Sequence, residues 1–127
     1  MGEFDVDMKI FDGPEYQDSQ QLSERTGVFL NERVYVSLDM IDPLKQDNIV
    51  MSIQTCYATD SPDYSQMGLF HYMISSMCAH PGDETINIIE NGVSDEARFS
   101  FQMFRFTDAF SYIYIHCEGE FYNVLIY

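Results

Sequence analysis

Short runs in which apolar and polar side chains alternate constrain the fold of this chain more than any other feature. The clearest run is residues 97–106, which contains Arg98-Phe99-Ser100-Phe101. Alternate side chains of a β-strand face opposite sides of its sheet, so this pattern predicts a half-buried strand. A second run, residues 110–117, follows after a short connection. We predict that the two runs form a long antiparallel hairpin.

Five further runs have the composition of strands. Tyr, Phe, Val and Ile are frequent in them, and turn residues such as Asp42-Pro43 and Pro81-Gly82-Asp83 lie between them. They are residues 4–11, 28–40, 48–56, 69–74 and 85–90, with 15–26 as a polar connection and 58–66 as a loop. Asn91-Gly92 suits a turn with positive φ. Seven or eight closely spaced strands without a convincing helix predict an all-β fold, two antiparallel sheets packed as a sandwich.

Size and charge narrow the possible functions. We expect a single domain over residues 1–127, of which residues 1–3 could derive from cloning. Six Lys and Arg stand against 21 Asp and Glu, for a formal net charge of −15. Nucleic acid and anionic membrane surfaces would repel such a chain. No apolar stretch approaches the length of a membrane span, so we expect no membrane contact by this segment.

The positions of the three cysteines predict a disulfide bond. Cys56 ends a central predicted strand and Cys117 lies on the last strong one, as a link between two sheets would require. Such a disulfide would stabilise the fold by roughly 4 kcal/mol and would indicate an oxidising compartment. The alternative is three reduced, buried thiols in a cytosolic β protein. Cys78 is left unpaired in either case, and Cys56 has the opposite parity to the apolar residues that precede it in its strand, which alternation does not explain.

No pattern in the sequence indicates an enzyme, a cofactor or a metal centre. His71, His80 and His116 lack metalloprotease spacing, and the cysteines contain no Cys-x-x-Cys pair. Cys78 lies close to His80, but nothing marks the third group that a thiol nucleophile needs. We expect His71 and His116 to be strand residues with satisfied ring nitrogens. Neither a glycine-rich phosphate loop nor a serine nucleophile motif occurs.

Several stretches taken together resemble the C-terminal half of a zona pellucida (ZP) module. They are residues 90–106, Tyr114-Ile115-His116-Cys117-Glu118, residues 55–62, which begin Thr55-Cys56-Tyr57-Ala58-Thr59, and residues 74–78. The resemblance implies an immunoglobulin-like antiparallel β-sandwich in which Cys56 pairs with Cys117. It also implies a fourth cysteine near position 122 as the partner of Cys78. Tyr122 stands there, so we expect Cys78 to be an unpaired thiol and residues 122–127 to be an atypical tail.

The resemblance also implies a function and a location. Members of this family are secreted or membrane-anchored glycoproteins that form extracellular filaments and matrices. We therefore expect a non-enzymatic structural module that joins protein partners, either copies of itself or the matching N-terminal ZP half, through edge strands and apolar faces. Val124, Leu125, Ile126 and Tyr127 form a candidate assembly strand, or alternatively the last strand of the domain's own sheet. A different possibility is a ligand-binding ectodomain whose loops recognise a protein or bind calcium weakly.

Overall fold

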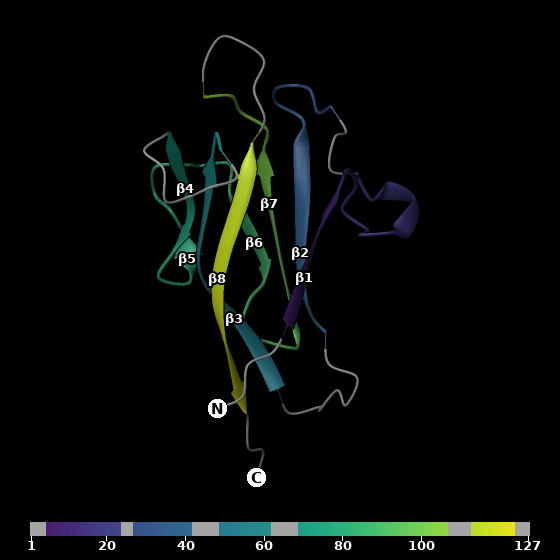
Figure 1. Cartoon of the computed structure of the whole chain (residues 1–127), viewed down its shortest axis with the longest axis vertical. Helices are drawn as coiled ribbons and strands as arrows, with labels where there is room; N and C mark the ends of the chain where they lie inside the picture. Colours follow the sequence, from purple (N-terminus) through teal and green to yellow (C-terminus); the bar gives the residue numbers. More distant parts are fainter. Residues whose placement is uncertain (1–4, 24–26, 42–48, 62–68, 107–112, 124–127) are drawn as a thin grey trace.

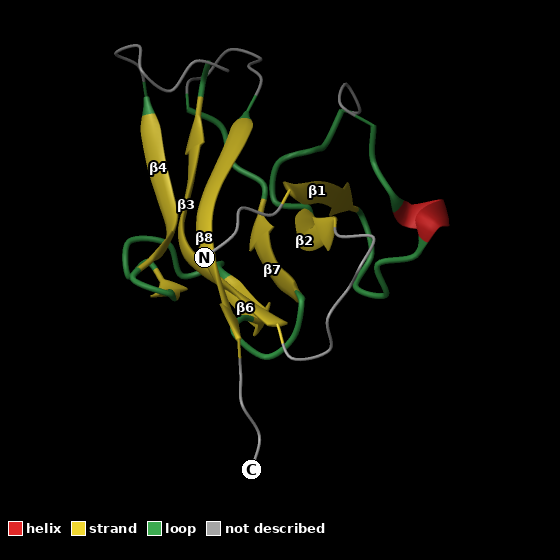
Figure 2. Cartoon of the chain, turned by 60° about the horizontal axis from the view of Figure 1, so that its bottom comes forward, coloured by secondary structure: helices red, strands yellow, loops and turns green. Residues whose placement is uncertain are grey.

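The computed structural model describes residues 5–23, 27–41, 49–61, 69–106 and 113–123. They form two four-stranded antiparallel sheets that pack face to face (Figures 1 and 2). The first sheet has the order β1 (Asp5–Phe11), β2 (Arg33–Ile41), β7 (Glu96–Gln102) and β6 (Asn87–Glu90). The second has the order β5 (Cys78–Ala79), β4 (Phe70–Ser75), β3 (Ile49–Thr59) and β8 (Tyr114–Asn123). The predicted all-β, immunoglobulin-like sandwich is confirmed, with one short 3₁₀ turn, Asp18–Gln20, in the described part of the chain.

The core lies between the sheets and comes mainly from β2, β3 and β7. Phe99 and Phe101, the aromatic residues of the strongest alternating run, are almost fully buried. Their rings pack with centroids 6.5 Å apart. Removing such apolar surface from water is the main favourable contribution to folding. The remaining buried members are Val34, Val36, Leu38, Met40, Ile49, Met51, Ile53, Cys56, Ala58, Met73, Ile74, Ile86 and Ala97.

The predicted hairpin of residues 97–106 and 110–117 is wrong. β7 pairs with β2 and β6 in the first sheet, whereas β8 pairs with β3 in the second. Alternation reports which side of a strand is buried, but it does not report which strand lies beside it. After β7 the chain stays with the first sheet for one more residue, since Met103 bonds to the main chain of Glu32 and Asn31. It then crosses to the other sheet.

Strand limits also differ from the expectation. β3 runs on to Thr59, into the segment expected as a loop, and β2 begins at Arg33 rather than at residue 28. β5, a two-residue strand that alternation cannot detect, pairs with β4 and forms the edge of the second sheet. The expected turn at Asn91-Gly92 is confirmed, with φ of 78° at Gly92.

A β-bulge explains the parity of Cys56. Ile53 lies opposite Gly119 of β8, but Thr55 lies opposite Glu118, so β3 holds one extra residue at Gln54. One extra residue turns every following side chain of the strand to the opposite face of the sheet. Cys56 therefore joins the core side, where it is fully buried. The strands approach so closely at this bulge that a Cβ on Gly119 would lie 2.7 Å from the Ser52 carbonyl oxygen.

Candidate functional site

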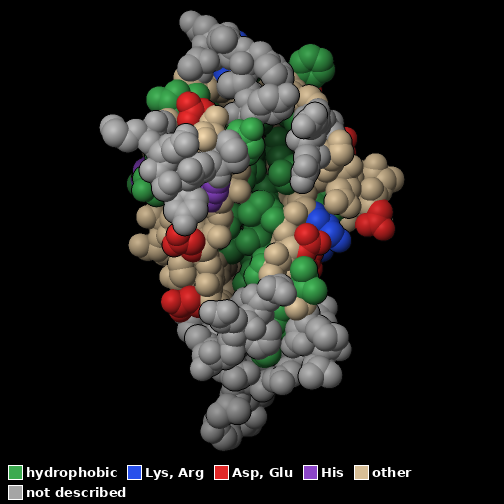
Figure 3. Space-filling view, in the orientation of Figure 1, with side chains coloured by type: hydrophobic (Ala, Val, Ile, Leu, Met, Phe, Trp, Pro, Cys, Tyr) green, Lys and Arg blue, Asp and Glu red, His purple; other side chains and the backbone are tan. Residues whose placement is uncertain are grey.

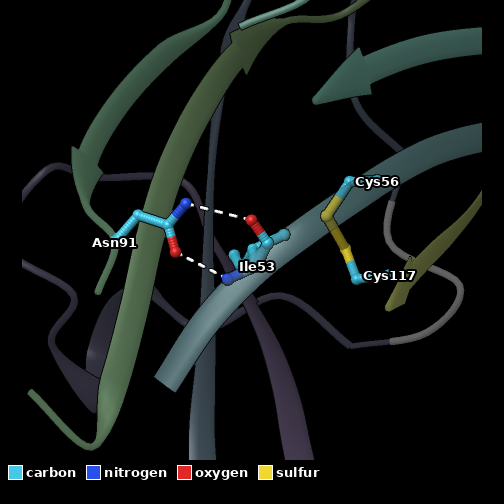
Figure 4. The surroundings of a disulfide bond; sticks show 4 residues. All are labelled: Ile53, Cys56, Asn91 and Cys117. Atoms are coloured by element: carbon cyan, nitrogen blue, oxygen red, sulfur yellow. Dashed lines mark hydrogen bonds between the residues drawn. A yellow bond between two sulfur atoms is a disulfide. The ribbon is translucent and has the colours of Figure 1, made fainter. Parts of the chain in front are cut away.

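The disulfide lies within one sheet rather than between the two. Cys56 and Cys117 are directly opposite each other on β3 and β8, with their sulfurs 2.06 Å apart (Figure 4). The pairing agrees with the sequence prediction, but the expected link between sheets is wrong. The error follows from the hairpin, because it placed residues 110–117 beside β7 instead of beside β3. Both cysteines belong to the second sheet, and the bond fixes β8 against the centre of that sheet.

The spacing of this pair shows where the backbone of β8 points. The Cα atoms of Cys56 and Cys117 are 4.2 Å apart. Opposite residues in an antiparallel ladder are about 4.5 Å apart where they do not bond each other and about 5.5 Å apart where they do. The N–H and C=O groups of Cys117 therefore point away from β3, as do those of Ile115 two residues earlier. They face the outer edge of β8, the last strand of its sheet.

An apolar furrow lies between the β8 edge and the β1 edge of the other sheet. It encloses a cavity of about 470 Å³. Figure 3 shows its hydrophobic side chains in the hollow between the two sheets. Its apolar lining comes from both sheets and the adjoining loops, and consists of Met8, Ile10, Leu22, Val28, Val34, Phe101, Met103, Ile113 and Ile115. Several of these, including Met8, Ile10 and Ile115, are only half-buried.

The β1 side of the furrow is partly closed by the chain itself. The N–H of Leu22 donates to the Ile10 carbonyl at 2.8 Å, and the N–H of Asp12 donates to the Gln20 carbonyl at 2.9 Å. These bonds cover the end of β1 nearest Phe11. In the described part of the chain no strand pairs with the outer edge of the preceding residues of β1 or with that of β8. The furrow thus lies between two exposed strand edges.

The opposite edge of β3 is closed by residues 91–94. The side chain of Asn91 accepts a hydrogen bond from the Ile53 N–H at 2.6 Å and donates one to the Ile53 carbonyl at 3.1 Å (Figure 4). Next to it, Gly92 and Ser94 bond to the main chain of Met51 at 2.8 and 2.7 Å. An amide side chain thus replaces a neighbouring strand beside the bulge. A partner strand could add to the second sheet along β8 but not at this point of β3.

The outer face of the first sheet is covered at one end by the polar connection that follows β1. The Tyr16 ring packs against Phe11 and Tyr35, with centroids 5.2 and 5.9 Å away, and the Arg98 guanidinium lies 4.5 Å from its centre. Its hydroxyl donates to the Phe99 carbonyl at 3.3 Å. Burial raises the pKa of Tyr16 to about 12, although the Arg98 charge acts in the opposite direction. The sequence predicted a polar connection here, with room for a short edge strand, but gave no sign that Tyr16 packs on the sheet.

His71 and His116 each have a polar side-chain partner, and Cys78 is a free thiol. His71 Nε2 lies 2.6 Å from Asp83 Oδ2, and His116 Nε2 lies 2.8 Å from Thr59 Oγ1, so the Nε2 atom of each ring has a polar partner. Cys78 is free and exposed on β5. Among the described residues, no three His, Cys, Asp or Glu gather in a metal-binding arrangement. The candidate assembly strand, Val124 to Tyr127, lies outside the described residues.

The contact between His71 and Asp83 lets us predict how the free energy of unfolding changes in acid. Burial alone would raise the pKa of Asp83, but hydrogen bonds from His71 and Thr85 outweigh it and lower the pKa. A carboxylate with a lowered folded-state pKa stabilises the fold above its unfolded pKa of 3.8, and this contribution disappears as pH falls through the folded value. We expect Asp83→Asn to cost about 1 kcal/mol at pH 7, after screening by solvent, and to flatten the acid side of the stability profile. Urea unfolding of the original chain and of Asp83→Asn between pH 7 and pH 2 measures the free energy of unfolding at each pH. The exposed Asp18→Asn is the control, and an unchanged acid slope in Asp83→Asn would contradict the prediction.

Comparison with known proteins identifies the family. The sequence model of the ZP-C domain matches residues 1–123. The chain belongs to the ZP-C domain family. Uromodulin from Rattus norvegicus is 36% identical over 118 residues, which cover 92% of this chain and 18% of uromodulin. The pancreatic secretory granule membrane major glycoprotein GP2 from Mus musculus is 32% identical over 117 residues, covering 92% and 22%, and alpha-tectorin from Gallus gallus is 30% identical over 118 residues, covering 91% and 5%.

Membership of the ZP-C family and the disulfide both bear on where the protein is located. The chain spans less than a quarter of the length of these relatives. The ZP-C domain and the disulfide identify an extracellular protein, because structural disulfides persist in oxidising compartments. No described helix is long and apolar enough to cross a membrane.

Proposed function

We propose that this ZP-C domain is a non-enzymatic connecting module of an extracellular filament or matrix, and that it holds a neighbour by accepting a β-strand along β8. The observation that carries the proposal is that, within the described residues, no strand pairs with the outer edge of β8, and that this edge borders an apolar furrow. A free edge offers hydrogen bonds to any extended chain, and pockets for alternate side chains make such pairing selective. The relatives support the same role, since they include uromodulin, the secretory granule membrane glycoprotein GP2 and alpha-tectorin.

The geometry defines how such a strand would bind. Its main chain would pair with the outward N–H and C=O groups of Ile115 and Cys117. Alternate side chains of an added strand point to one face, so every second residue would enter the furrow beside Met8 and Ile10. The disulfide keeps β8 in register while this outer edge is in use. A strand with no charge and a high β-propensity fits best, because a buried, unpaired charge is costly.

The proposed occupant is a strand from another protein chain, either a second copy of this protein or the N-terminal half of its module. Val124, Leu125, Ile126 and Tyr127 have the required composition, since all four are apolar or aromatic and none is charged. We propose these residues as a candidate for the donated strand. The alternative is that these residues are only a final strand of the domain's own sheet, continuing from β8 after Asn123.

A proline on β8 tests the proposal. Because the N–H of Ile115 points outward, Ile115→Pro removes a hydrogen bond donor from the free edge while leaving the ladder to β3 intact. We expect the parent glycoprotein with this change to be secreted and folded but to form no filaments in electron microscopy. Ile115→Val, which keeps the donor, is the matched control. Met8→Glu, which places a carboxylate in the furrow from the half-buried edge strand, should have the same effect without a proline. Normal filaments from both folded variants would refute the proposal.

A further inference from the structure

A stack of aromatic rings covers the outer face of the second sheet, on the far side of that sheet from the core. Tyr57 of β3 lies at its centre, with its ring centroid 5.3 Å from Phe70 of β4 and 5.0 Å from His116 of β8. The interplanar angles of 26° and 20° describe stacked rings. Tyr72 lies beside Phe70, with centroids 6.4 Å apart. We call these four residues the aromatic face.

The aromatic face presents large apolar surface to solvent. Tyr57 is buried beneath its neighbours, but Phe70 and Tyr72 remain 46% and 47% exposed. They are neighbours on one strand of the sheet, so their exposed surfaces are contiguous. The outer face of the first sheet differs, because Tyr16 and Arg98 pack over it. A contiguous exposed patch of this kind is typical of a site where another molecule binds.

The strands of the second sheet, on which the aromatic face lies, contain acidic residues but no Lys or Arg. None of the six Lys and Arg of the chain lies within β3, β4, β5 or β8. Glu118 and Glu120 are exposed on β8 and share the parity of His116, which places them on the same side of the sheet. At the other end, exposed Asp60 follows β3 and its Oδ1 accepts the Leu69 N–H at 3.2 Å. Glu118 and Glu120 thus lie two strands away from Phe70 and Tyr72 on the same side of the sheet, and Asp60 lies at the connection between β3 and β4.

We propose that the aromatic face binds an arginine-bearing segment of a different protein. A guanidinium group is planar, stacks on aromatic rings and pairs with carboxylates, so it matches both features of this face. Lysine shares the charge but lacks the planar fork, which gives a preference for arginine. Two copies joined through this face do not fit, since the strands of the second sheet contain Glu118 and Glu120 but no Lys or Arg, and carboxylates would oppose carboxylates. The site is on the opposite side of the second sheet from the furrow and serves a different partner.

Titration of the complete 127-residue chain with octaarginine and octalysine peptides tests this inference. We expect octaarginine to bind more tightly at physiological salt and to shift the NMR signals of Tyr57, Phe70, Tyr72 and His116. The double variant Phe70→Ala/Tyr72→Ala should weaken octaarginine binding about tenfold, because it removes two exposed cation–π partners. Phe29→Ala, which removes a Phe that is 80% exposed elsewhere, is the matched control and should leave the affinity unchanged.

Charge and furrow variants separate this site from nonspecific attraction and from the proposed assembly site. Glu118→Gln should weaken octaarginine binding more than Glu32→Gln, an exposed glutamate outside the second sheet. Met8→Glu, a furrow variant on the other sheet, should leave the binding unchanged, so failure of the assembly proposal and failure of this one are distinguishable. Equal affinity for both peptides, or undiminished binding to the double variant, would overturn the inference. Shifts of the same rings by maltohexaose, without any response to octaarginine, would also overturn it and indicate a carbohydrate site.

Discussion

Replacing both disulfide cysteines, as Cys56→Ala/Cys117→Ala, is expected to lower the free energy of unfolding by about 4 kcal/mol. The two residues are 61 positions apart, so the bond removes a large amount of chain entropy from the unfolded state. Small domains are stable by only about 5–15 kcal/mol, which means that this variant approaches the limit of folding. Cys56 is also fully buried, and losing its sulfur from the core adds to the cost. Urea unfolding followed by circular dichroism measures the change.

The third cysteine supplies the control. Cys78 is free and exposed, so Cys78→Ala should change the stability by no more than about 0.5 kcal/mol. Alkylation under denaturing, non-reducing conditions followed by peptide mapping should label Cys78 alone. Equal labelling of all three cysteines, or an equal loss of stability in the two variants, would show that the bond is absent or contributes nothing. The same experiment tests the extracellular location, because a cytosolic protein would keep these thiols reduced.

Much of the fold could be predicted from alternation, because burial on one side of a strand leaves a direct mark on the sequence. Phe99 and Phe101 were expected on one face, and both are buried in the core. Strand pairing leaves no comparable mark, since the same alternation fits any neighbour whose apolar side faces the core. Residues 110–117 were therefore assigned to the wrong sheet. The contradictory parity of Cys56 was the one local sign of the bulge at Gln54, and it could be interpreted only once Gly119 was known to lie opposite Ile53.

The candidate site was less predictable than the fold. The furrow depends on which two strands lie at the facing edges, and this is a property of topology rather than of any motif. Met8 and Ile115 are far apart in the sequence and carry ordinary strand patterns. The burial of Tyr16 was likewise not predictable. Its segment has no alternation, and a single aromatic residue does not indicate which surface its ring packs against. The cysteines were found because their chemistry restricts their use, whereas apolar side chains are too common to mark a surface.

Asn91→Ala is expected to lower the free energy of unfolding by about 2–4 kcal/mol, although Asn91 lies in a turn. The Asn91 side chain satisfies both the N–H and the C=O of Ile53 at the point where the bulge interrupts the ladder. Alanine leaves both groups without these bonds, and each buried unsatisfied group costs about 1–3 kcal/mol.

Two further variants separate this role from that of the turn itself. Asn91→Asp keeps the oxygen that accepts the Ile53 N–H but loses the amide that donates to the Ile53 carbonyl, so its loss should be intermediate. Asn87→Ala changes an exposed amide on β6 and should be nearly neutral. Amide hydrogen exchange gives the site-specific measurement, because the Ile53 N–H should lose protection in Asn91→Ala but keep part of it in Asn91→Asp. Protection that is equal in all three variants would mean that the contact with Ile53 does not stabilise the bulge.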